Sequence, residues 1–223
     1  MILDKMAKKA IIIGASGLIG SELLSVLLHE PAYTEVITLV RKSLNTYHPK
    51  LKEIITDFSN LSEMKENIKA DVIFCCIGTT RAKTPDLNTY RKIDHDIPIE
   101  IGKIAVENQV KQYHLVSALG ANAQSSNFYS KIKGETEDDL KALNIPAIHI
   151  YQPSLLRGER KEKRVGEKIA LVLMKAVDPL LVGSLKKYRS IKTSVIALAM
   201  YQQSLKEDKG IFTYPSDIIK EIV

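Results

Sequence analysis

The chain has 223 residues, of which 45% are hydrophobic and 26% are charged, and its formal net charge is +6. This length suits one hydrophobic core, so we expect a single domain over residues 1–223. No apolar stretch is long enough to span a bilayer, and the lysines are spread along the chain instead of forming one block. These features argue against an integral membrane protein, and neither a nucleic-acid partner nor a membrane partner is expected.

Two features predict a cytoplasmic location. Residues 1–9 carry charges where a signal peptide would have an apolar run. Cys75 and Cys76 are adjacent in an apolar stretch, which suits neither a disulfide framework nor a zinc site. The histidines show no ligand spacing either, so no metal is expected and a reducing compartment is favoured.

The first half of the chain alternates strand and helix patterns. Residues 10–13 form a short run of apolar, β-branched side chains ended by a glycine, which is typical of a strand buried on both faces. Apolar residues at helical spacing follow over 18–28 and stop before Pro31. Further strands are predicted at 36–40, 53–56 and 71–77.

The second half continues this alternation. A long helical stretch over 86–110 is expected to be interrupted at Pro98. Strands alternating with helices predict an α/β fold, a doubly wound parallel sheet with helices on both faces. The remaining predicted elements are a strand at 113–116, a charged helix at 127–143, a strand at 147–151, helices at 165–176 and 192–205, and a strand at 211–214.

A glycine-rich turn joins the first strand to the first helix. A tight strand-to-helix turn, a close approach to a pyrophosphate and close packing of helix on strand each require a residue without a side chain. Free amide groups at the start of the helix would face the phosphates, and a serine hydroxyl could add a donor. The turn therefore predicts a dinucleotide site formed by Gly14, Ala15, Ser16, Gly17, Leu18, Ile19 and Gly20.

The residues after the second strand bear on the choice of dinucleotide. Arg41 and Lys42 stand where proteins selective for NAD usually place a carboxylate for the ribose hydroxyls. An arginine can bind a 2′-phosphate, so NADP(H) is favoured over NAD(H), and the competing interpretation is a solvated basic loop. By topology, the adenine and ribose would lie near Asp57 and Phe58 after the third strand and near Gly78, Thr79 and Thr80 after the fourth, and Cys76 and Ile77 are also expected to bind the cofactor.

Tyr129 and Lys133 are four residues apart, so on a helix they share one face. A tyrosine near pKa 10 is a poor acid-base catalyst at neutral pH unless a neighbour stabilises the phenolate, and a lysine can do so. The same pattern recurs at Tyr188 and Lys192, but no strand precedes that pair. We therefore assign the catalytic role to Tyr129 with Lys133, and Ser117 is the candidate for orienting a substrate carbonyl.

The chain resembles the atypical short-chain dehydrogenase/reductases, and specifically their Tat-interacting oxidoreductase-like branch. The resemblance covers nearly the whole chain and implies an NADP(H)-binding Rossmann fold of about seven strands in the order 3-2-1-4-5-6-7. It also implies that the Tyr-Lys pair is Tyr129 and Lys133, and that Pro153 to Leu156, including Leu155, lie against the nicotinamide. The matching stretches are 14–20, 74–80, 90–96, 116–121, 125–134 and 153–160.

Two positions depart from the superfamily pattern. Ser117 is followed by Ala118, where many members have a second hydroxyl residue, so the serine role could fall to Ser117, Ser125 or Ser126. An asparagine of the central helix that commonly supports a proton relay is replaced by Asp94, as in the branch that the chain resembles.

Three functions compete at this point. The first is an NADPH-dependent reductase of a small carbonyl compound, the second is an NADP(H)-sensing regulator or scaffold, and the weakest is a sugar-nucleotide epimerase. Residues 157–210 are expected to cover the substrate. Within them Arg157, Arg160 and Arg164 could bind an acidic substrate, although a solvated loop is favoured. The substrate, the reaction direction and the oligomeric state are open, with a homodimer among the expected assemblies.

Overall fold

The computed structural model describes residues 7–157 and 178–223. Its main element is a seven-stranded parallel sheet in the order β3-β2-β1-β4-β5-β6-β9. This arrangement confirms the predicted Rossmann-type α/β fold and strand order, with β9 as the seventh strand. The strands are β1 (Lys8–Ile13), β2 (Tyr33–Val40), β3 (Leu51–Ile55), β4 (Val72–Cys75), β5 (Gln112–Val116), β6 (Ala147–Gln152) and β9 (Gly210–Pro215).

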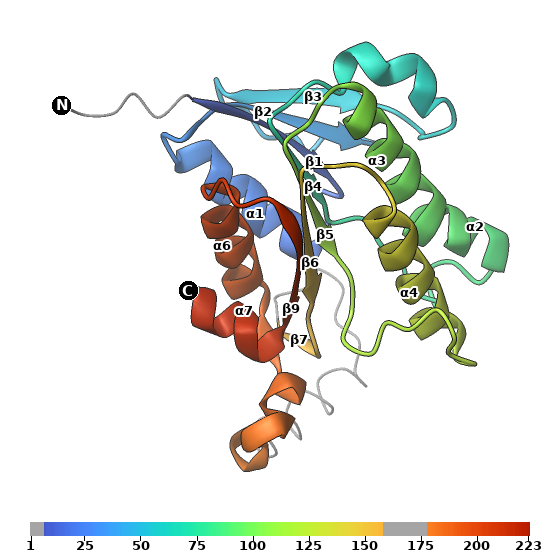
Figure 1. Cartoon of the computed structure of the whole chain (residues 1–223). Coiled ribbons are helices and arrows are strands. Elements are labelled where there is room, and N and C mark those ends of the chain that lie inside the picture. Colours follow the sequence, from blue (N-terminus) through green and yellow to red (C-terminus); the bar gives the residue numbers. More distant parts are fainter. Residues whose placement is uncertain (1–6, 158–177) are drawn as a thin grey trace.

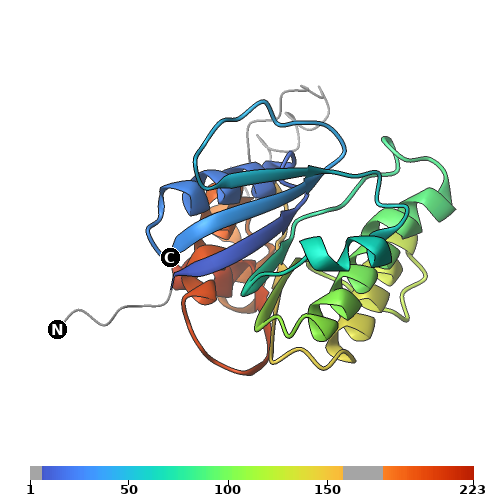
Figure 2. The same ribbon diagram turned by 90° about the horizontal axis from the view of Figure 1, so that it is seen from above.

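Helices cover both faces of the sheet, as Figures 1 and 2 show. One layer contains α1 (Leu18–His29), α6 (Thr193–Ser204) and α7 (Ser216–Ile222). The other contains the 3-10 helix η1 (Leu61–Asn67), α3 (Ile97–Glu107) and α4 (Phe128–Lys141). Alternate residues of each buried strand point to opposite layers. Ile12 therefore packs under α1 and α6, whereas Ile13 packs in the core under α3 and α4.

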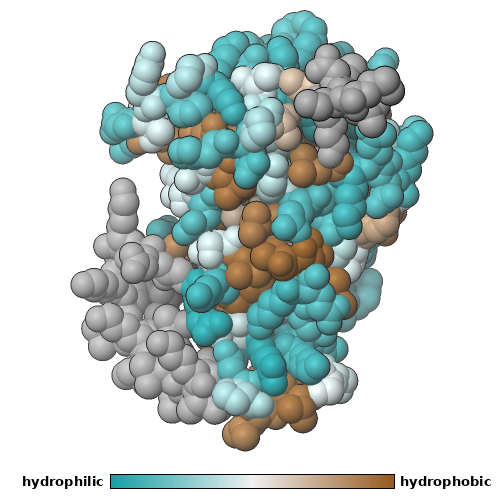
Figure 3. Space-filling view, turned by 90° about the vertical axis from the view of Figure 1, so that its left-hand side faces the viewer, coloured by the Kyte–Doolittle hydropathy of each residue, from teal (hydrophilic) through white to brown (hydrophobic). Residues whose placement is uncertain are grey.

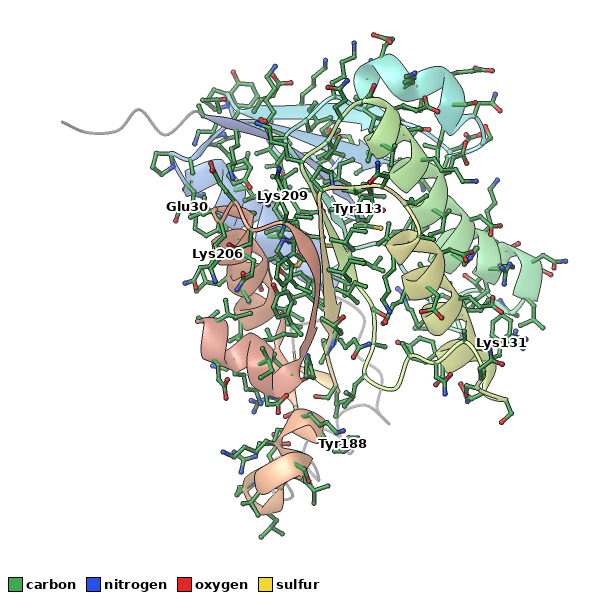
Figure 4. All side chains as sticks on the ribbon, in the orientation of Figure 1. Glu30, Tyr113, Lys131, Tyr188, Lys206 and Lys209 are labelled. Atoms are coloured by element: carbon green, nitrogen blue, oxygen red, sulfur yellow. The ribbon has the colours of Figure 1, made fainter. Side chains whose placement is uncertain are left out.

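The helix before β5 contains a π-helical turn instead of the break predicted at Pro98. Its parts are α2 (Leu87–Arg91), the π turn η2 (Lys92–Asp96) and α3. Pro98 lies in the first turn of α3, but the helix runs into it from the π turn without a break, so its missing N–H leaves out one helical hydrogen bond. Its carbonyl oxygen accepts a hydrogen bond from the Tyr113 hydroxyl at 2.9 Å, and Figure 4 labels Tyr113 on the side of the sheet that faces α3.

A small second sheet lies beyond the carboxyl ends of the main strands. Here β7 (Leu156–Arg157) pairs in parallel with β8 (Ile191–Lys192), and two 3-10 helices, η3 (Asp178–Leu180) and η4 (Gly183–Tyr188), precede β8. These elements and α7 were not predicted, because each is short and is held by residues distant in sequence. The helix predicted at 165–176 lies outside the described residues.

The outer surface is mixed in polarity. Figure 3 views the molecule from the side of α1, α6 and α7, where an apolar area lies among hydrophilic residues. Leu180 and Val182, near the small sheet, are more than half exposed. Within the described part of the chain, no helix has the length and apolar character needed to cross a membrane.

Two histidine side chains stack on the face of the sheet that packs against α6. The rings of His114 on β5 and His149 on β6 are parallel, with centroids 4.3 Å apart, and both side chains are buried. His149 Nδ1 lies 3.0 Å from the Tyr214 hydroxyl, while its Nε2 is buried without a hydrogen-bond partner among the described residues. An imidazolium would have an unsatisfied N–H at that nitrogen. Burial accordingly lowers the pKa of His149 to about 4 and places the pKa of His114 well below its usual value.

Acidification is expected to destabilise the fold through these rings. An unfolded histidine titrates near 6.5, so the unfolded chain binds more protons between pH 6.5 and pH 4, and the free energy of unfolding falls as the pH drops through that window. For His149 alone the loss between pH 7 and pH 5 is about 2 kcal/mol. Urea denaturation at both pH values measures it. The loss should shrink in His149→Phe and persist in the exposed control His29→Gln; an unchanged loss in His149→Phe would contradict this account.

Candidate functional site

The glycine-rich turn is fixed by the contact between β1 and β4. Gly14 follows β1 with φ +85°, and a Cβ atom there would lie 2.7 Å from the backbone of Cys76 and Ile77. A Cβ atom on Gly20 would overlap the Gly14 carbonyl oxygen. Both positions therefore require glycine, because the backbone of neighbouring segments occupies the space of a side chain.

The N-terminus of α1 is free to bind an anion. Gly17 is the residue before the helix, no side chain caps it, and no acidic residue lies in the first turn. The helix dipole and the unpaired N–H groups of this turn suit a pyrophosphate. Ser16 is exposed beside it, whereas Ala15 and Ile19 are buried and anchor the turn to the core. The described residues thus fit the phosphates of a dinucleotide.

Residues after β2 and β3 line the same edge of the sheet. Arg41 and Lys42 are exposed and make no ion pair with another described residue. The Asp57 carboxylate accepts hydrogen bonds from the backbone N–H and the hydroxyl of Ser59, which lower its pKa. Phe58 has φ +61° and a ring buried in the core, so a nucleotide would meet its backbone and not its ring.

The segment after β4 connects the glycine turn to a buried charge pair. Cys76 and Ile77 contact Gly14, and Gly78 lies beside the side chains of Asp94 and Lys133. The N–H of Thr79 donates a 2.8 Å hydrogen bond to Asp94 Oδ2. The hydroxyl of Tyr90, in α2, donates to the carbonyl oxygen of Thr79 at 3.2 Å.

Lys133 and Asp94 form an ion pair inside the protein. Their Nζ and Oδ1 atoms are 2.9 Å apart, and the side chains are 8% and 1% exposed. Burial alone would lower the pKa of Lys133, but the attraction and hydrogen bond of the Asp94 carboxylate, with smaller contributions from Tyr129 and Cys75, together outweigh it, so the pKa is raised and the ammonium persists at neutral pH. The sequence singled out both residues but not their contact, since a lysine and an aspartate 39 positions apart carry no pairing signal.

The π turn presents Asp94 to Lys133. A π turn displaces backbone carbonyls from the regular helical pattern. The Thr136 hydroxyl of α4 lies 2.9 Å from the carbonyl oxygen of Asp94 and 2.8 Å from that of Ile132. The irregular turn is therefore tied directly to the helix that carries Lys133.

Tyr129 lies one turn before Lys133 on α4, and its side chain is 43% exposed. Partial burial raises the pKa of its hydroxyl, while Lys133 acts in the opposite direction. Tyr129 is thus protonated at neutral pH and can donate a proton. The competing pair does not share a helix, because Tyr188 ends η4 and Lys192 lies in β8.

Ser117 is buried, and its hydroxyl donates to Glu137 Oε1 at 2.5 Å. Glu137, on α4, is itself 3% exposed and accepts two contacts from the Gln152 amide, at 2.9 and 3.0 Å. Glu137 and Gln152 were not anticipated from the sequence. Of the alternative serines, Ser125 Oγ accepts the N–H of Asn127 before α4, and Ser126 is exposed.

The residues after β6 lead from the main sheet to the small one. Pro153 is buried and accepts the N–H of Leu119, while Leu155 is 40% exposed. Leu156 begins β7. The carboxyl ends of β1, β4, β5 and β6 thus gather the glycine turn, the Tyr–Lys helix and this segment at one edge of the sheet, the edge where ligands bind in open α/β folds.

Comparison with known proteins agrees with this geometry. A family model described as NAD(P)H-binding matches residues 14–170. Protein FMP52, mitochondrial, of Candida albicans is 34% identical over 219 residues, covering 94% of this chain and 96% of that protein. Protein HTATIP2 of Rattus norvegicus is 32% identical over 172 residues, covering 74% and 70%.

Solved structures share the fold at low identity. The Bordetella bronchiseptica enzyme WbmG in complex with NAD superposes with a TM-score of 0.70 at 14% identity, over 96% of this chain and 74% of that one. A UDP-N-acetylglucosamine 4-epimerase from Methanobrevibacter ruminantium gives 0.69 at 15% identity, over 93% and 76%. These similarities establish the fold alone.

The prediction of a cytoplasmic location is wrong. The relatives from Candida albicans, Emericella nidulans and Eremothecium gossypii are all named mitochondrial proteins. The prediction failed because free cysteines are compatible with any reducing compartment, and charges in residues 1–9 do not distinguish one such compartment from another.

The family model covers 157 of the 223 residues, from 14 to 170. It agrees with the glycine turn at the start of α1 and with the Tyr–Lys pair at the adjacent strand ends. The chain belongs to the NAD(P)H-binding family of atypical short-chain dehydrogenase/reductases.

Proposed function

We propose that the protein is an NADPH-dependent reductase of a small carbonyl compound. The observation that carries this proposal is the buried Lys133–Asp94 ion pair, with Tyr129 one helical turn away and Gly78 alongside. A buried ion pair is a weak source of stability compared with apolar packing, so its retention beside an accessible tyrosine favours a chemical role.

The chain's own residues divide the work of binding. The turn from Gly14 to Gly20 would hold the pyrophosphate, Arg41 and Lys42 the 2′-phosphate, and Asp57 with the Phe58 backbone the adenine. Pro153 and Leu155 would limit the space around the nicotinamide. When bound, NADPH supplies the hydride, and the protein supplies orientation and the proton.

Tyr129 is proposed to donate that proton to the carbonyl oxygen of the substrate. Its side chain is partly exposed, and its hydroxyl is protonated at neutral pH. After donation it becomes a phenolate, which the Lys133 ammonium stabilises electrostatically. Asp94 acts as a positioning residue, because it holds Lys133 charged and fixes its direction.

The main alternative is a protein that binds NADP(H) and signals its state without turnover. One observation favours it: the hydrogen of Ser117 is directed to Glu137, so this hydroxyl, in the described conformation, accepts but does not donate. A reductase that lacks a serine donor depends on Tyr129 alone to polarise the carbonyl group.

Nucleotide selectivity tests the role of Arg41. Arg41→Ala should weaken NADPH binding about tenfold, because one charge-assisted contact to a phosphate is lost, and should leave NADH binding nearly unchanged. Titration followed by nucleotide fluorescence measures both constants. Lys52→Ala, an exposed lysine within β3, is the control for net charge. Equal weakening in the two variants would remove Arg41 from the site.

Turnover tests the role of Tyr129. Tyr129→Phe should reduce the rate of NADPH oxidation by small aldehydes and ketones about 100-fold or more, since a general acid is removed, while the affinity for NADPH stays the same. Tyr188→Phe, from the second Tyr-x-x-x-Lys pattern, should keep the full rate. Nucleotide binding without turnover of any carbonyl compound in the wild type would favour the sensor instead.

The pH profile tests the role of Asp94. In Asp94→Asn the opposing charge is lost and burial lowers the pKa of Lys133. The Lys133 ammonium, which stabilises the Tyr129 phenolate, should therefore lose its proton at a lower pH than in the wild type. The rate of Asp94→Asn should therefore decline earlier as the pH rises from 7 to 10. Asp96→Asn, at an exposed carboxylate two residues away, should keep the wild-type profile. Superimposable profiles for all three proteins would refute this role.

A further inference from the structure

Basic side chains of several elements meet around a cavity of about 570 Å³ beside α7. This volume lies within the range of roughly 300–1,000 Å³ typical of small-molecule sites. Tyr188, the neighbour of Arg189 in the chain, marks this end of the molecule in Figure 4. The described lining residues, none of which belongs to the predicted nucleotide site or to the Tyr–Lys pair, are Arg157, Asp178, Pro179, Arg189, Ser190 and Lys220.

Asp178, the one carboxylate among the described lining residues, already has its hydrogen bonds. Asp178 Oδ1 accepts the Ser190 N–H at 2.9 Å, and Asp178 Oδ2 accepts the Ser190 hydroxyl. Asp178 is therefore held at the wall by Ser190. Among the described lining residues, three cationic side chains face one carboxylate, which leaves an excess of two positive charges.

None of the three cations forms an ion pair with a carboxylate of the described residues. Arg157 is partly buried, and its Nε atom is fully buried without a hydrogen-bond partner in that part of the chain. Arg189 is fixed in place, because its Nε donates to the carbonyl oxygen of Leu181 at 2.7 Å and one Nη to that of Pro179 at 3.3 Å.

The like charges act on one another. Burial, followed by Arg157 and Arg189, lowers the pKa of Lys220, and the attraction of Asp178 and Asp217 does not offset these effects. A smaller cavity of about 190 Å³ shares Arg189 and Lys220 and adds Lys186 together with the carboxylates Asp217 and Glu221. Cations held together at partly desolvated positions are stabilised when an anion binds between them.

We infer that this cavity binds the phosphate group of a small molecule. Two excess positive charges match a doubly charged oxyanion, and guanidinium groups bind phosphate oxygens through paired N–H donors. The remaining volume exceeds that of a phosphate ion and would hold the organic part of a phosphate ester. The inference does not rest on the proposed reductase activity, because none of the residues assigned to the nucleotide or to proton donation lines this cavity.

Calorimetric titration of the full chain with inorganic phosphate, at low constant ionic strength and without nucleotide, tests the inference. Saturable binding is expected, with acetate at least tenfold weaker because it carries one charge. Lys220→Met and Arg157→Gln should each weaken phosphate binding tenfold or more. Arg189 is not used, because its substitution would also release the Leu181 and Pro179 carbonyls.

Lys209→Met is the matched control: Lys209 is exposed, lies before β9 and is labelled far from Tyr188 in Figure 4. It should leave phosphate binding unchanged, and all variants should keep the wild-type NADPH affinity and thermal midpoint. Absence of saturable phosphate binding, equal binding of acetate, or equal weakening in Lys209→Met would each overturn the inference. Failure of NADPH binding with intact phosphate binding would count against the proposed reductase and not against this site.

Discussion

The candidate site depends on the buried ion pair between Lys133 and Asp94. Removing two charges from water costs several kcal/mol per ion, and the mutual attraction offsets this cost only with close geometry and further hydrogen bonds. The 2.9 Å separation and the Thr79 N–H on the second Asp94 oxygen meet both conditions. Loss of either partner would leave an unpaired charge in the core, so α4, the π turn and the end of β4 must be positioned together.

The strand order places this pair next to the glycine turn. Because β4 lies beside β1, the backbone of Cys76 packs against Gly14, and two residues later Gly78 reaches the side chains of Asp94 and Lys133. The strand order reverses between β1 and β4: β2 and β3 are added on one side of β1, whereas β4 and β5 are added on the other. A dinucleotide bound along this edge would thus contact both the amides of α1 and the neighbourhood of Tyr129.

Local patterns predicted most of this framework. The buried strands and the turn at Gly14 are encoded by short runs of apolar residues and by glycine, so they can be read without tertiary information. The π turn and the Ser117–Glu137 contact could not be read, because each depends on residues 20 or more positions away. The small β7–β8 sheet has two residues in each strand, too few to produce a pattern.

The roles of the basic residues also depend on contacts between residues that are distant in sequence. In the sequence, Lys133 is distinguished from the other basic residues by its spacing from Tyr129 and Arg157 by its place in a basic run, but Lys220 is one of 32 basic residues with nothing to mark it. Folding pairs Lys133 with Asp94, whereas Arg157 and Lys220 meet at a cavity whose carboxylate is held by Ser190. A charge that the fold has already paired serves to orient a neighbour, here Tyr129. A charge that the fold has gathered with others of its own sign is stabilised only by an anion from outside, and that difference separates a positioning residue from a binding residue.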